Sequence, residues 1–127
     1  MGKALVRVYR DLEVYQTAFN SAMAIFEASK KFPVEERYSL TDQMRRSSRS
    51  VCANLGEAWR KRRYRAAFIA QLSDCQAEAT ETQIWLGFAV KCQYLEPATG
   101  RNLYRSYDKV LGQLALMVKN ADSWIMH

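Results

Sequence analysis

The residues of this chain that are best suited to chemistry are the arginines between Met44 and Arg65. This stretch contains eight basic residues and a single acid, Glu57, whereas the whole chain of 127 residues has a formal net charge of +6. Arginine guanidinium groups match phosphate oxygens in a bidentate geometry, so a row of them along one helix suits the backbone of a nucleic acid. The candidate nucleic-acid-binding residues are Arg45, Arg46, Arg49, Arg60, Lys61, Arg62, Arg63 and Arg65.

Two other interpretations of these basic residues stay open. They can form a solvated helix face whose guanidinium groups pair with carboxylates of a neighbouring subunit, or they can simply keep a modestly basic protein in solution. The aromatic residues Tyr38, Trp59 and Tyr64 lie close by in the sequence. Their rings would suit stacking on bases if a nucleic acid is the partner.

The sequence contains no arrangement that is typical of a catalytic or cofactor site. Its one histidine, His127, is the last residue, so no Ser–His or Cys–His pair can be proposed. A glycine-rich phosphate loop and the H-E-x-x-H pattern are both missing. A di-iron bundle needs Glu-x-x-His pairs on two helices, which this chain cannot supply. We therefore expect a non-enzymatic protein without a cofactor or a metal.

Four polar residues close to the inward helix faces are expected to have structural roles. Glu57, Glu78 and Glu81 are expected to pair with arginines of the second helix rather than to bind a metal. Asn54 is expected to set the helix register through a buried hydrogen bond.

The cysteine count and the hydropathy pattern indicate a cytoplasmic location. Three cysteines without a C-x-x-C pair argue against a disulfide framework and a zinc site, so Cys52, Cys75 and Cys92 are expected to be reduced and packed as small apolar groups. The N-terminus lacks the apolar core of a signal peptide. No apolar run approaches the roughly 20 residues that a membrane span needs.

Apolar residues at three- and four-residue spacing predict four amphipathic helices. Glycine and proline are scarce, with five and two residues, which fits long helices joined by short links. Such links favour antiparallel neighbours, so we predict a single-domain, all-α, antiparallel up-down-up-down four-helix bundle over residues 1–127, with residues 1–10 as a flexible arm. Asp11 is the expected N-cap of the first helix, and Ser39 to Asp42 resembles a capping box. The first helix is expected over residues 11–31, and the second begins at the Ser39–Asp42 box and runs into residues 60–65. The third then continues to about residue 94, and the fourth covers residues 97–124.

The second helix is expected to have two faces. Gly56, in its middle, is expected to allow the close approach of a neighbouring helix. A break is needed within residues 60–65, but no Gly, Pro, Ser or Asp marks it, so one continuous long helix stays open as an alternative. The expected inward residues are Leu40, Met44, Ser47, Val51, Leu55 and Ala58, and the expected outward residues are Arg45, Arg49, Arg60 and Arg63.

The third helix is apolar over an unusually wide face. This width predicts burial against a second surface, such as another subunit. Trp59, Phe68, Trp85 and Trp124 stand at core spacing, so we expect them to pack rather than to line a ligand pocket. The regular stripe is Phe68, Leu72, Cys75, Ala79, Thr82, Leu86 and Ala89, and the residues that widen it are Ile69, Ile84, Trp85, Phe88 and Val90.

Three blocks of this chain resemble a known family of small bacterial helical proteins. The blocks are Tyr9 to Ala18, Phe32 to Arg46 with its continuation through Ser50 to Ala58, and Phe68 to Leu72 with Glu78 to Thr82, Trp85-Leu86 and Tyr94-Leu95. They are similar to the four-helix-bundle proteins first noted as products of intervening sequences in 23S ribosomal RNA genes. One departure is that Asn54-Leu-Gly-Glu-Ala58 exchanges the glycine and alanine of the usual Asn-Ile-Ala-Glu-Gly pattern. Another is that the serine that often opens the third helix is missing.

The resemblance implies an antiparallel four-helix bundle that assembles into a five-fold ring, a homopentamer. A related group serves the reverse transcriptase of diversity-generating retroelements as an accessory protein, through a basic surface. From the residues and the resemblance together we predict a homo-oligomer that binds RNA or DNA through the basic face of the second helix. The alternative is a structural adaptor that recruits an acidic or reverse-transcriptase-like protein partner and uses its arginines in subunit contacts.

Overall fold

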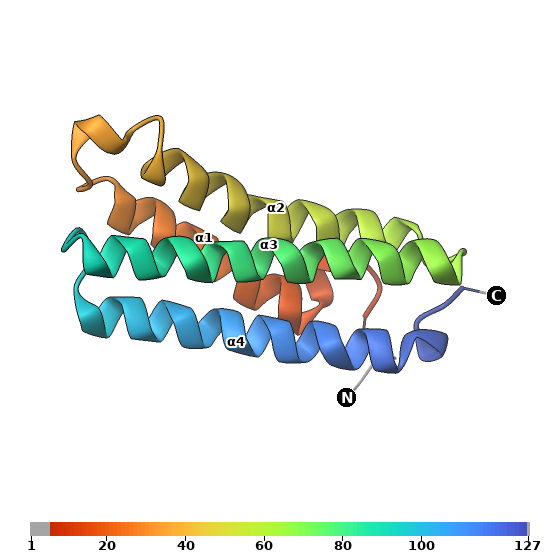
Figure 1. The fold of residues 1–127 in the computed structure, drawn as a ribbon. Coiled ribbons are helices and arrows are strands. Elements are labelled where there is room, and N and C mark those ends of the chain that lie inside the picture. Colours follow the sequence, from red (N-terminus) through yellow and green to blue (C-terminus); the bar gives the residue numbers. More distant parts are fainter. Residues whose placement is uncertain (1–5, 127) are drawn as a thin grey trace.

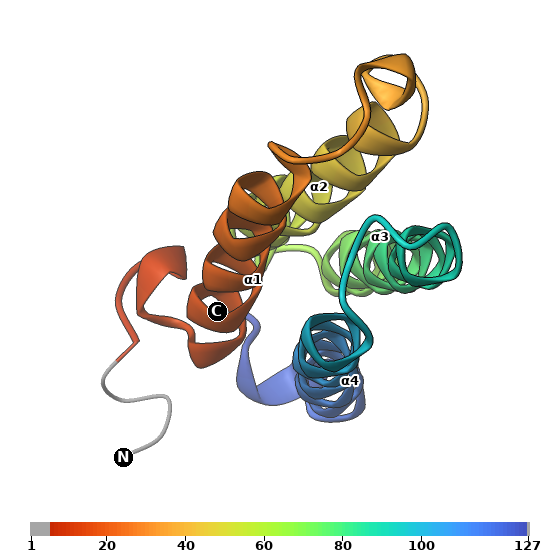
Figure 2. The ribbon, with the colours of Figure 1, turned by 90° about the vertical axis from the view of Figure 1, so that its left-hand side faces the viewer.

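The computed structural model describes residues 6–126, and this part of the chain is helical throughout (Figure 1). Each long helix packs against two others, with α2 and α4 each beside both α1 and α3. The end-on view shows the four helices around a shared interior (Figure 2). The long helices are α1 (Glu13–Ser29), α2 (Leu40–Arg60), α3 (Arg65–Lys91) and α4 (Pro97–Lys119), and the short 3-10 turns are η2 (Tyr9–Asp11), η3 (Val34–Glu36) and η4 (Ala121–Ser123).

The predicted helical bundle is confirmed, and its interior follows the predicted stripes closely. All of the regular stripe residues of α2 and α3 are buried. Tyr107 of α4 and Phe68 of α3 are the largest fully buried side chains. On α1, Phe19 lies outside this interior, because it is 47% exposed and stacks on Tyr15 with ring centroids 6.0 Å apart.

The start of α1 differs from the prediction, because Asp11 caps a different element. Its carboxylate accepts hydrogen bonds from the backbone N–H groups of Arg7, at 2.9 Å, and Val8, at 3.1 Å. These backbone bonds lower the pKa of Asp11. They close η2, and α1 begins two residues later at Glu13. Residues 6–10 of the expected flexible arm are therefore folded onto the bundle, while residues 1–5 lie outside the described residues.

The start of α2 also uses an acid that the capping-box pattern did not identify. The Ser39 side chain makes no cap to the helix. Instead Glu36 Oε1 accepts from Ser39 Oγ at 2.6 Å and from the backbone N–H of Leu40 at 3.3 Å. The hydroxyl of Tyr94, just after α3, donates to Glu36 Oε2 at 2.9 Å. One carboxylate thus joins the η3 turn, the start of α2 and the end of α3.

The break between α2 and α3 lies at residues 61–64, so the alternative of one continuous helix is wrong. Long basic side chains and tertiary contacts hold this turn in place of a glycine or proline. Arg62 Nε donates to the carbonyl of Trp59 at 2.9 Å, and Lys61 Nζ donates to Gln71 Oε1 of α3 at 2.7 Å. The backbone N–H of Met126 donates to the Arg62 carbonyl at 3.1 Å. The bond to Trp59 satisfies a carbonyl of the last turn of α2 that a helix end otherwise leaves unpaired.

One glycine prediction and one cysteine prediction need correction. Among residues 6–126, no neighbouring heavy atom would lie within 4 Å of a Cβ at Gly56, so close helix approach does not explain that glycine. The close approach occurs instead at Gly100, where a Cβ would collide with Cγ2 of Val90. Cys75 is buried and Cys52 is half-buried, but Cys92 is exposed and does not pack as an apolar group. None of the helices within residues 6–126 is long and apolar enough to cross a membrane.

Candidate nucleic-acid interface

Five arginines line one groove at the end of the bundle where α2 turns into α3. This groove, called the arginine groove below, has a volume of about 440 Å³. The first and last described segments of the chain both lie toward this end (Figure 1). Segments far apart in the sequence therefore converge on one site. The lining residues are Arg7, Val8, Tyr9, Arg10, Trp59, Arg60, Arg62, Arg63 and Met126.

The two N-terminal arginines are held at the groove by the η2 turn. The carboxylate of Asp11 fixes the backbone at Arg7 and Val8. The guanidinium of Arg10 lies 5.4 Å from the ring centroid of Tyr9, and its NH1 is 3.5 Å from the Tyr9 hydroxyl. Tyr9 in turn packs edge-on against Tyr15 of α1, with ring centroids 5.0 Å apart. A short turn therefore carries two cations to the end of α2.

Arg62 is the most firmly held of the five arginines. Its guanidinium lies 3.5 Å from the ring centroid of Trp59, while its Nε donates to the Trp59 carbonyl at 2.9 Å. Trp59 is buried and packs against Trp124, with ring centroids 6.0 Å apart. Stacking on an aromatic face leaves the planar edge of a guanidinium free for an acceptor. The tryptophan that was predicted to pack is thus also the platform for a cation.

The electrostatics of the arginine groove favour an anion. Within residues 6–126, none of the residues that line the groove is acidic and none of its five arginines forms an ion pair. Burial, and secondly the charge of Arg60, lower the pKa of Arg62. A bound phosphate would offset both effects, because an opposite charge stabilises the charged form of a base. Phosphate is therefore the ligand chemistry that this groove suits best.

The remaining second-helix arginines do not join this site. Arg45 is half-buried, with Nε donating to Ser29 Oγ at 2.8 Å and its guanidinium 4.8 Å from the Phe26 ring centroid. Arg49 lies over the same ring at 5.8 Å. The expected outward row is therefore wrong at Arg45, which covers α1. Arg46 faces Asp42 at 3.9 Å, and the rise of a helix places Arg49 about 16 Å from Arg60.

Two further basic residues of the predicted site already have partners. Arg65 Nε donates to Asp122 Oδ1 at 2.6 Å in an exposed ion pair that joins α3 to η4. Lys61 is engaged with Gln71 of α3, as described above. Of the eight predicted residues, the structure therefore brings three together in the arginine groove, namely Arg60, Arg62 and Arg63.

Two of the four predicted polar residues, Asn54 and Glu57, are arranged around Gln71, which the sequence pattern did not single out. Gln71 Nε2 donates to Asn54 Oδ1 at 2.5 Å and to Glu57 Oε1 at 3.1 Å. Asn54 also donates to the Ser50 carbonyl at 2.8 Å. Asn54 thus links α2 to α3 by a hydrogen bond that is half-buried, whereas a buried one was expected. Glu57 accepts from a glutamine, whereas an arginine was expected.

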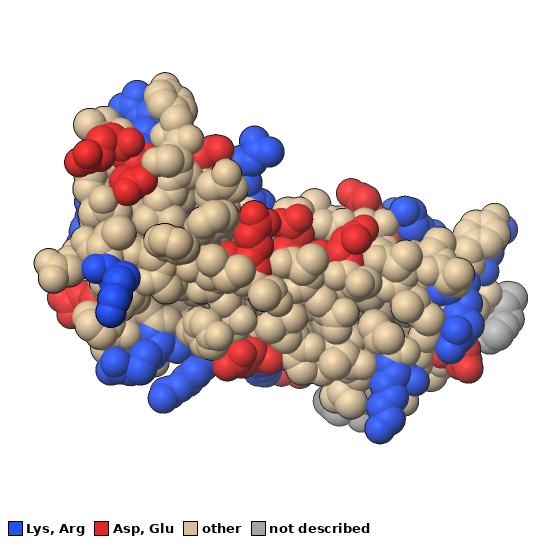
Figure 3. Space-filling view, viewed as in Figure 1, with Lys and Arg blue, Asp and Glu red and all other residues tan. Residues whose placement is uncertain are grey.

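The α3 acids form a stripe of their own. Within residues 6–126 neither Glu78 nor Glu81 forms an ion pair, in contrast to the expected pairing with second-helix arginines. Burial raises the pKa of Glu78, and the neighbouring Glu81 and Asp74 add to this effect. Acidic side chains gather in the middle of this face and basic ones toward its ends (Figure 3). No group of three or more His, Cys, Asp or Glu in the described range could hold a metal ion.

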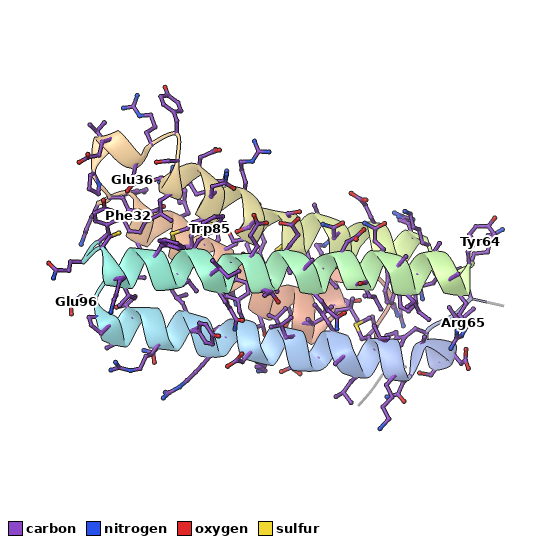
Figure 4. All side chains as sticks on the ribbon, viewed as in Figure 1. Phe32, Glu36, Tyr64, Arg65, Trp85 and Glu96 are labelled. Carbon is purple, nitrogen blue, oxygen red and sulfur yellow. The ribbon has the colours of Figure 1, made fainter. Side chains whose placement is uncertain are left out.

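A second groove lies at the opposite end of the bundle, beside the η3 turn. It has a volume of about 370 Å³ and includes Tyr38, Trp85 and Phe88. Phe88 is 55% exposed and Ile84, one turn earlier on α3, is 51% exposed. Trp85 lies at the same end as Phe32 and Glu36, whereas Tyr64 and Arg65 lie at the other (Figure 4). Part of the wide α3 face therefore remains uncovered in the single chain.

Comparison with known proteins agrees with this architecture. The sequence model of the family described as 23S rRNA-intervening sequence protein matches residues 10–115. The chain belongs to the 23S rRNA-intervening sequence protein family. This confirms the family that the three sequence blocks resemble. No curated protein matches the chain.

A solved structure of the S23 ribosomal protein family shares the fold of this 23S rRNA-intervening sequence protein. It is a protein of unknown function from Bacteroides thetaiotaomicron VPI-5482, 25% identical in sequence. The alignment covers 84% of this chain and 98% of that chain, with a TM-score of 0.75. The likeness supports the helical architecture and leaves the binding chemistry to the residues themselves.

The sequence pattern missed the N-terminal half of the arginine groove. Arg7-Val-Tyr-Arg10 places a basic residue on each side of two bulky ones, but it lies about 50 residues before the basic run at the end of the second helix. Arg7 also precedes residue 10, where the family match begins. Only the folded chain places the two groups in one groove.

Proposed function

We propose that this protein binds nucleic acid, RNA in the first place, through the arginine groove and without catalysing a reaction. The observation that carries the proposal is the convergence of five arginines from two distant segments on one groove, where none of them forms an ion pair with another described residue. Arg62 is fixed on Trp59 and Arg10 on Tyr9, which lowers the entropy lost when they bind a phosphate. The expected setting is the cytoplasm.

The test compares two variants that each lack three positive charges. Replacing Arg7, Arg60 and Arg63 by glutamine should weaken binding to RNA by roughly ten- to hundred-fold at ~0.15 M salt. The slope of log affinity against log salt concentration should become shallower by the equivalent of about two phosphate contacts. The control replaces Lys91, Arg101 and Arg105, which are exposed and lie outside the arginine groove. An equal loss of RNA affinity in both variants would mean that binding depends on net charge and not on the arginine groove.

We also propose that copies of the chain self-associate, with the homopentamer of the resemblance as the expected form. The support comes from α3, where Ile84 and Phe88 are exposed beside the half-buried Trp85. Assembly would present several arginine grooves to one RNA and raise the apparent affinity through multivalency. Light scattering with and without RNA tests this proposal, and a monomer under both conditions would overturn it.

The second candidate function is an adaptor that uses its arginines between subunits or toward an acidic, reverse-transcriptase-like partner. It is favoured by the acids of α3, because the raised pKa of Glu78 means that a nearby cation would be stabilising. The two candidates differ in what the Arg7, Arg60 and Arg63 variant does without RNA. A lower mass of the variant in light scattering would favour the adaptor, whereas an unchanged mass favours the RNA-binding groove.

A further inference from the structure

A third groove, distinct from the one beside the η3 turn, adjoins the arginine groove and differs from it in chemistry. It has a volume of about 420 Å³, and its exposed lining is mostly apolar. Tyr9 and Arg60 line both grooves, so the two are continuous. We call it the tyrosine groove. Its lining residues are Tyr9, Tyr15, Cys52, Ala53, Gly56, Glu57, Arg60 and Lys61.

Two small residues of α2 and two tyrosine rings line the tyrosine groove. Ala53 and Gly56 lie one turn apart on α2, and within the described residues 6–126 no neighbouring atom comes within 4 Å of where a Gly56 Cβ would stand. The rings of Tyr9 and Tyr15 meet at 78° on one side. A mid-helix glycine costs about 1 kcal/mol relative to alanine, and here no packing contact explains it. The space above Gly56 is therefore open to a flat ligand.

We propose that the tyrosine groove accepts an unpaired nucleobase whose flanking phosphates lie in the arginine groove. This inference rests on the nucleic-acid binding proposed above and specifies its substrate as single-stranded. Bases stack on aromatic side chains with little dependence on sequence. A duplex keeps its bases paired inside, and the wide minor groove of duplex RNA offers only their edges. A single strand can turn a base into the groove.

The charges around the two grooves favour the base in the tyrosine groove and the phosphates in the arginine groove. Glu57 lines only the tyrosine groove, where its carboxylate would repel a phosphate and can accept a hydrogen bond from a base edge. Lys61 lies at the same groove as a possible donor, although its Nζ also binds Gln71. Of the five arginines of the arginine groove, only Arg60 also lines the tyrosine groove. Phosphate therefore belongs in one groove and the base in the other.

The test measures the fluorescence anisotropy of three labelled RNA probes with the full chain. The probes are a short single strand, the same strand paired with its complement, and the same strand with abasic positions. Gly56→Leu should fill the tyrosine groove and reduce binding of the single strand roughly 5- to 100-fold, the range expected for a stacked base. Binding of the abasic strand and the salt dependence should not change. Ala53→Leu is a second filling variant in case Gly56→Leu fails to fold.

The matched control is Gly112→Leu on α4, where a Cβ would likewise meet nothing within 4 Å. It should leave all three affinities unchanged. Equal binding of single strand and duplex, with no effect of either filling variant, would overturn this inference and leave the proposed function standing. If no probe binds with salt dependence, the proposed function itself fails. Unchanged affinities with a lower mass in light scattering would instead place a second copy in the groove, which also overturns the inference.

Discussion

The two ends of this helical bundle carry different kinds of surface. At the α2–α3 end, five arginines converge on a groove whose cations rest on tyrosine and tryptophan rings. At the opposite end, the η3 turn and the start of α2 stand away from α3, and the groove beside them contains Tyr38, Trp85 and Phe88 (Figure 4). One end suits a charged polymer in water, whereas the other suits an apolar protein surface.

The difference teaches how one small bundle can keep two binding functions apart. Charged groups gain little from an exposed contact unless they are already held in place, and the ring contacts of Arg10 and Arg62 supply that order. Ile84 and Phe88 need no such support, because burial of apolar area is not directional. The proposed self-association at one end would therefore leave the arginine groove at the other end free for the proposed binding of RNA.

The largest effect is expected from breaking the apolar end. Replacing Ile84 and Phe88 by aspartate should dissociate the proposed oligomer, because two charges would enter an apolar interface. The affinity for long RNA should fall about a hundred-fold as multivalency is lost, while the chain stays folded because both positions are exposed. Light scattering and RNA titration measure the two effects together.

The control for that variant uses two other exposed apolar residues. Met23 of α1 is 45% exposed and Leu116 of α4 is 58% exposed, and neither lies on α3. Aspartate at both positions should leave the mass and the RNA affinity unchanged. If the α3 variant keeps the mass of the natural chain in light scattering, the apolar end does not mediate self-association.

Opposite effects of alanine at two glycines should sharpen the contrast. Gly100→Ala lies near the apolar end and would collide with Val90, which should destabilise the fold by about 1–3 kcal/mol. Gly56→Ala lies beside the tyrosine groove in open space and should stabilise the fold by up to about 1 kcal/mol. Urea unfolding of the two variants gives both values. The same sign for both would show that the space above Gly56 is filled by the protein itself.

The helices could be predicted from the sequence because their information is local. Every regular stripe residue of α2 and α3 is buried, from Leu40 to Ala89, since burial on a helix follows its period. The helix ends were less predictable because tertiary contacts decide them. Glu36 replaced the capping box through a bond that also involves Tyr94, 58 residues away. The 61–64 turn depends on Gln71 and on Met126.

Only one of the two segments that form the candidate site could be predicted from the sequence. Arg60, Arg62 and Arg63 stand in one basic run and were found by composition, but Arg7 and Arg10 join them only through the fold. Helical period also placed Arg45 on an outward face, although the end of α1 covers it through Phe26 and Ser29. Periodicity gives the direction of a side chain and does not give the position of the next helix.

A smaller effect is expected from exchanging arginine for lysine at two neighbouring positions. Arg62→Lys keeps the charge but loses the planar contact with Trp59 and the Nε bond to its carbonyl, which should cost about 1–2 kcal/mol of stability. Arg60→Lys should stay within about 0.5 kcal/mol, because Arg60 is exposed. Denaturant unfolding compares the two. Equal values would mean that Trp59 does not hold Arg62 in solution.

The smallest effect is expected at the apolar end, from pH. Hydrogen bonds from Ser39 and Tyr94, with a third from the Leu40 backbone, hold the pKa of Glu36 below its usual value, and the same contact with Glu36 raises the pKa of Tyr94 to about 12. A lowered carboxyl pKa gives stability at neutral pH that disappears as pH falls below ~4 through the folded pKa. A raised tyrosine pKa gives stability that is complete below ~10 and disappears as pH rises towards 12.

Two variants isolate these contributions. Glu36→Gln should be less stable than the natural chain at pH 7 and should approach it in acid, while Tyr94→Phe should approach it in alkali. Arg65, paired with Asp122 in an exposed contact at the other end, should show no comparable pH dependence on replacement by glutamine near neutral pH. Thermal unfolding across pH measures all three. A difference for Glu36→Gln that is independent of pH would mean that the η3 turn is not held by this carboxylate, and the groove beside Trp85 would then lack a fixed wall.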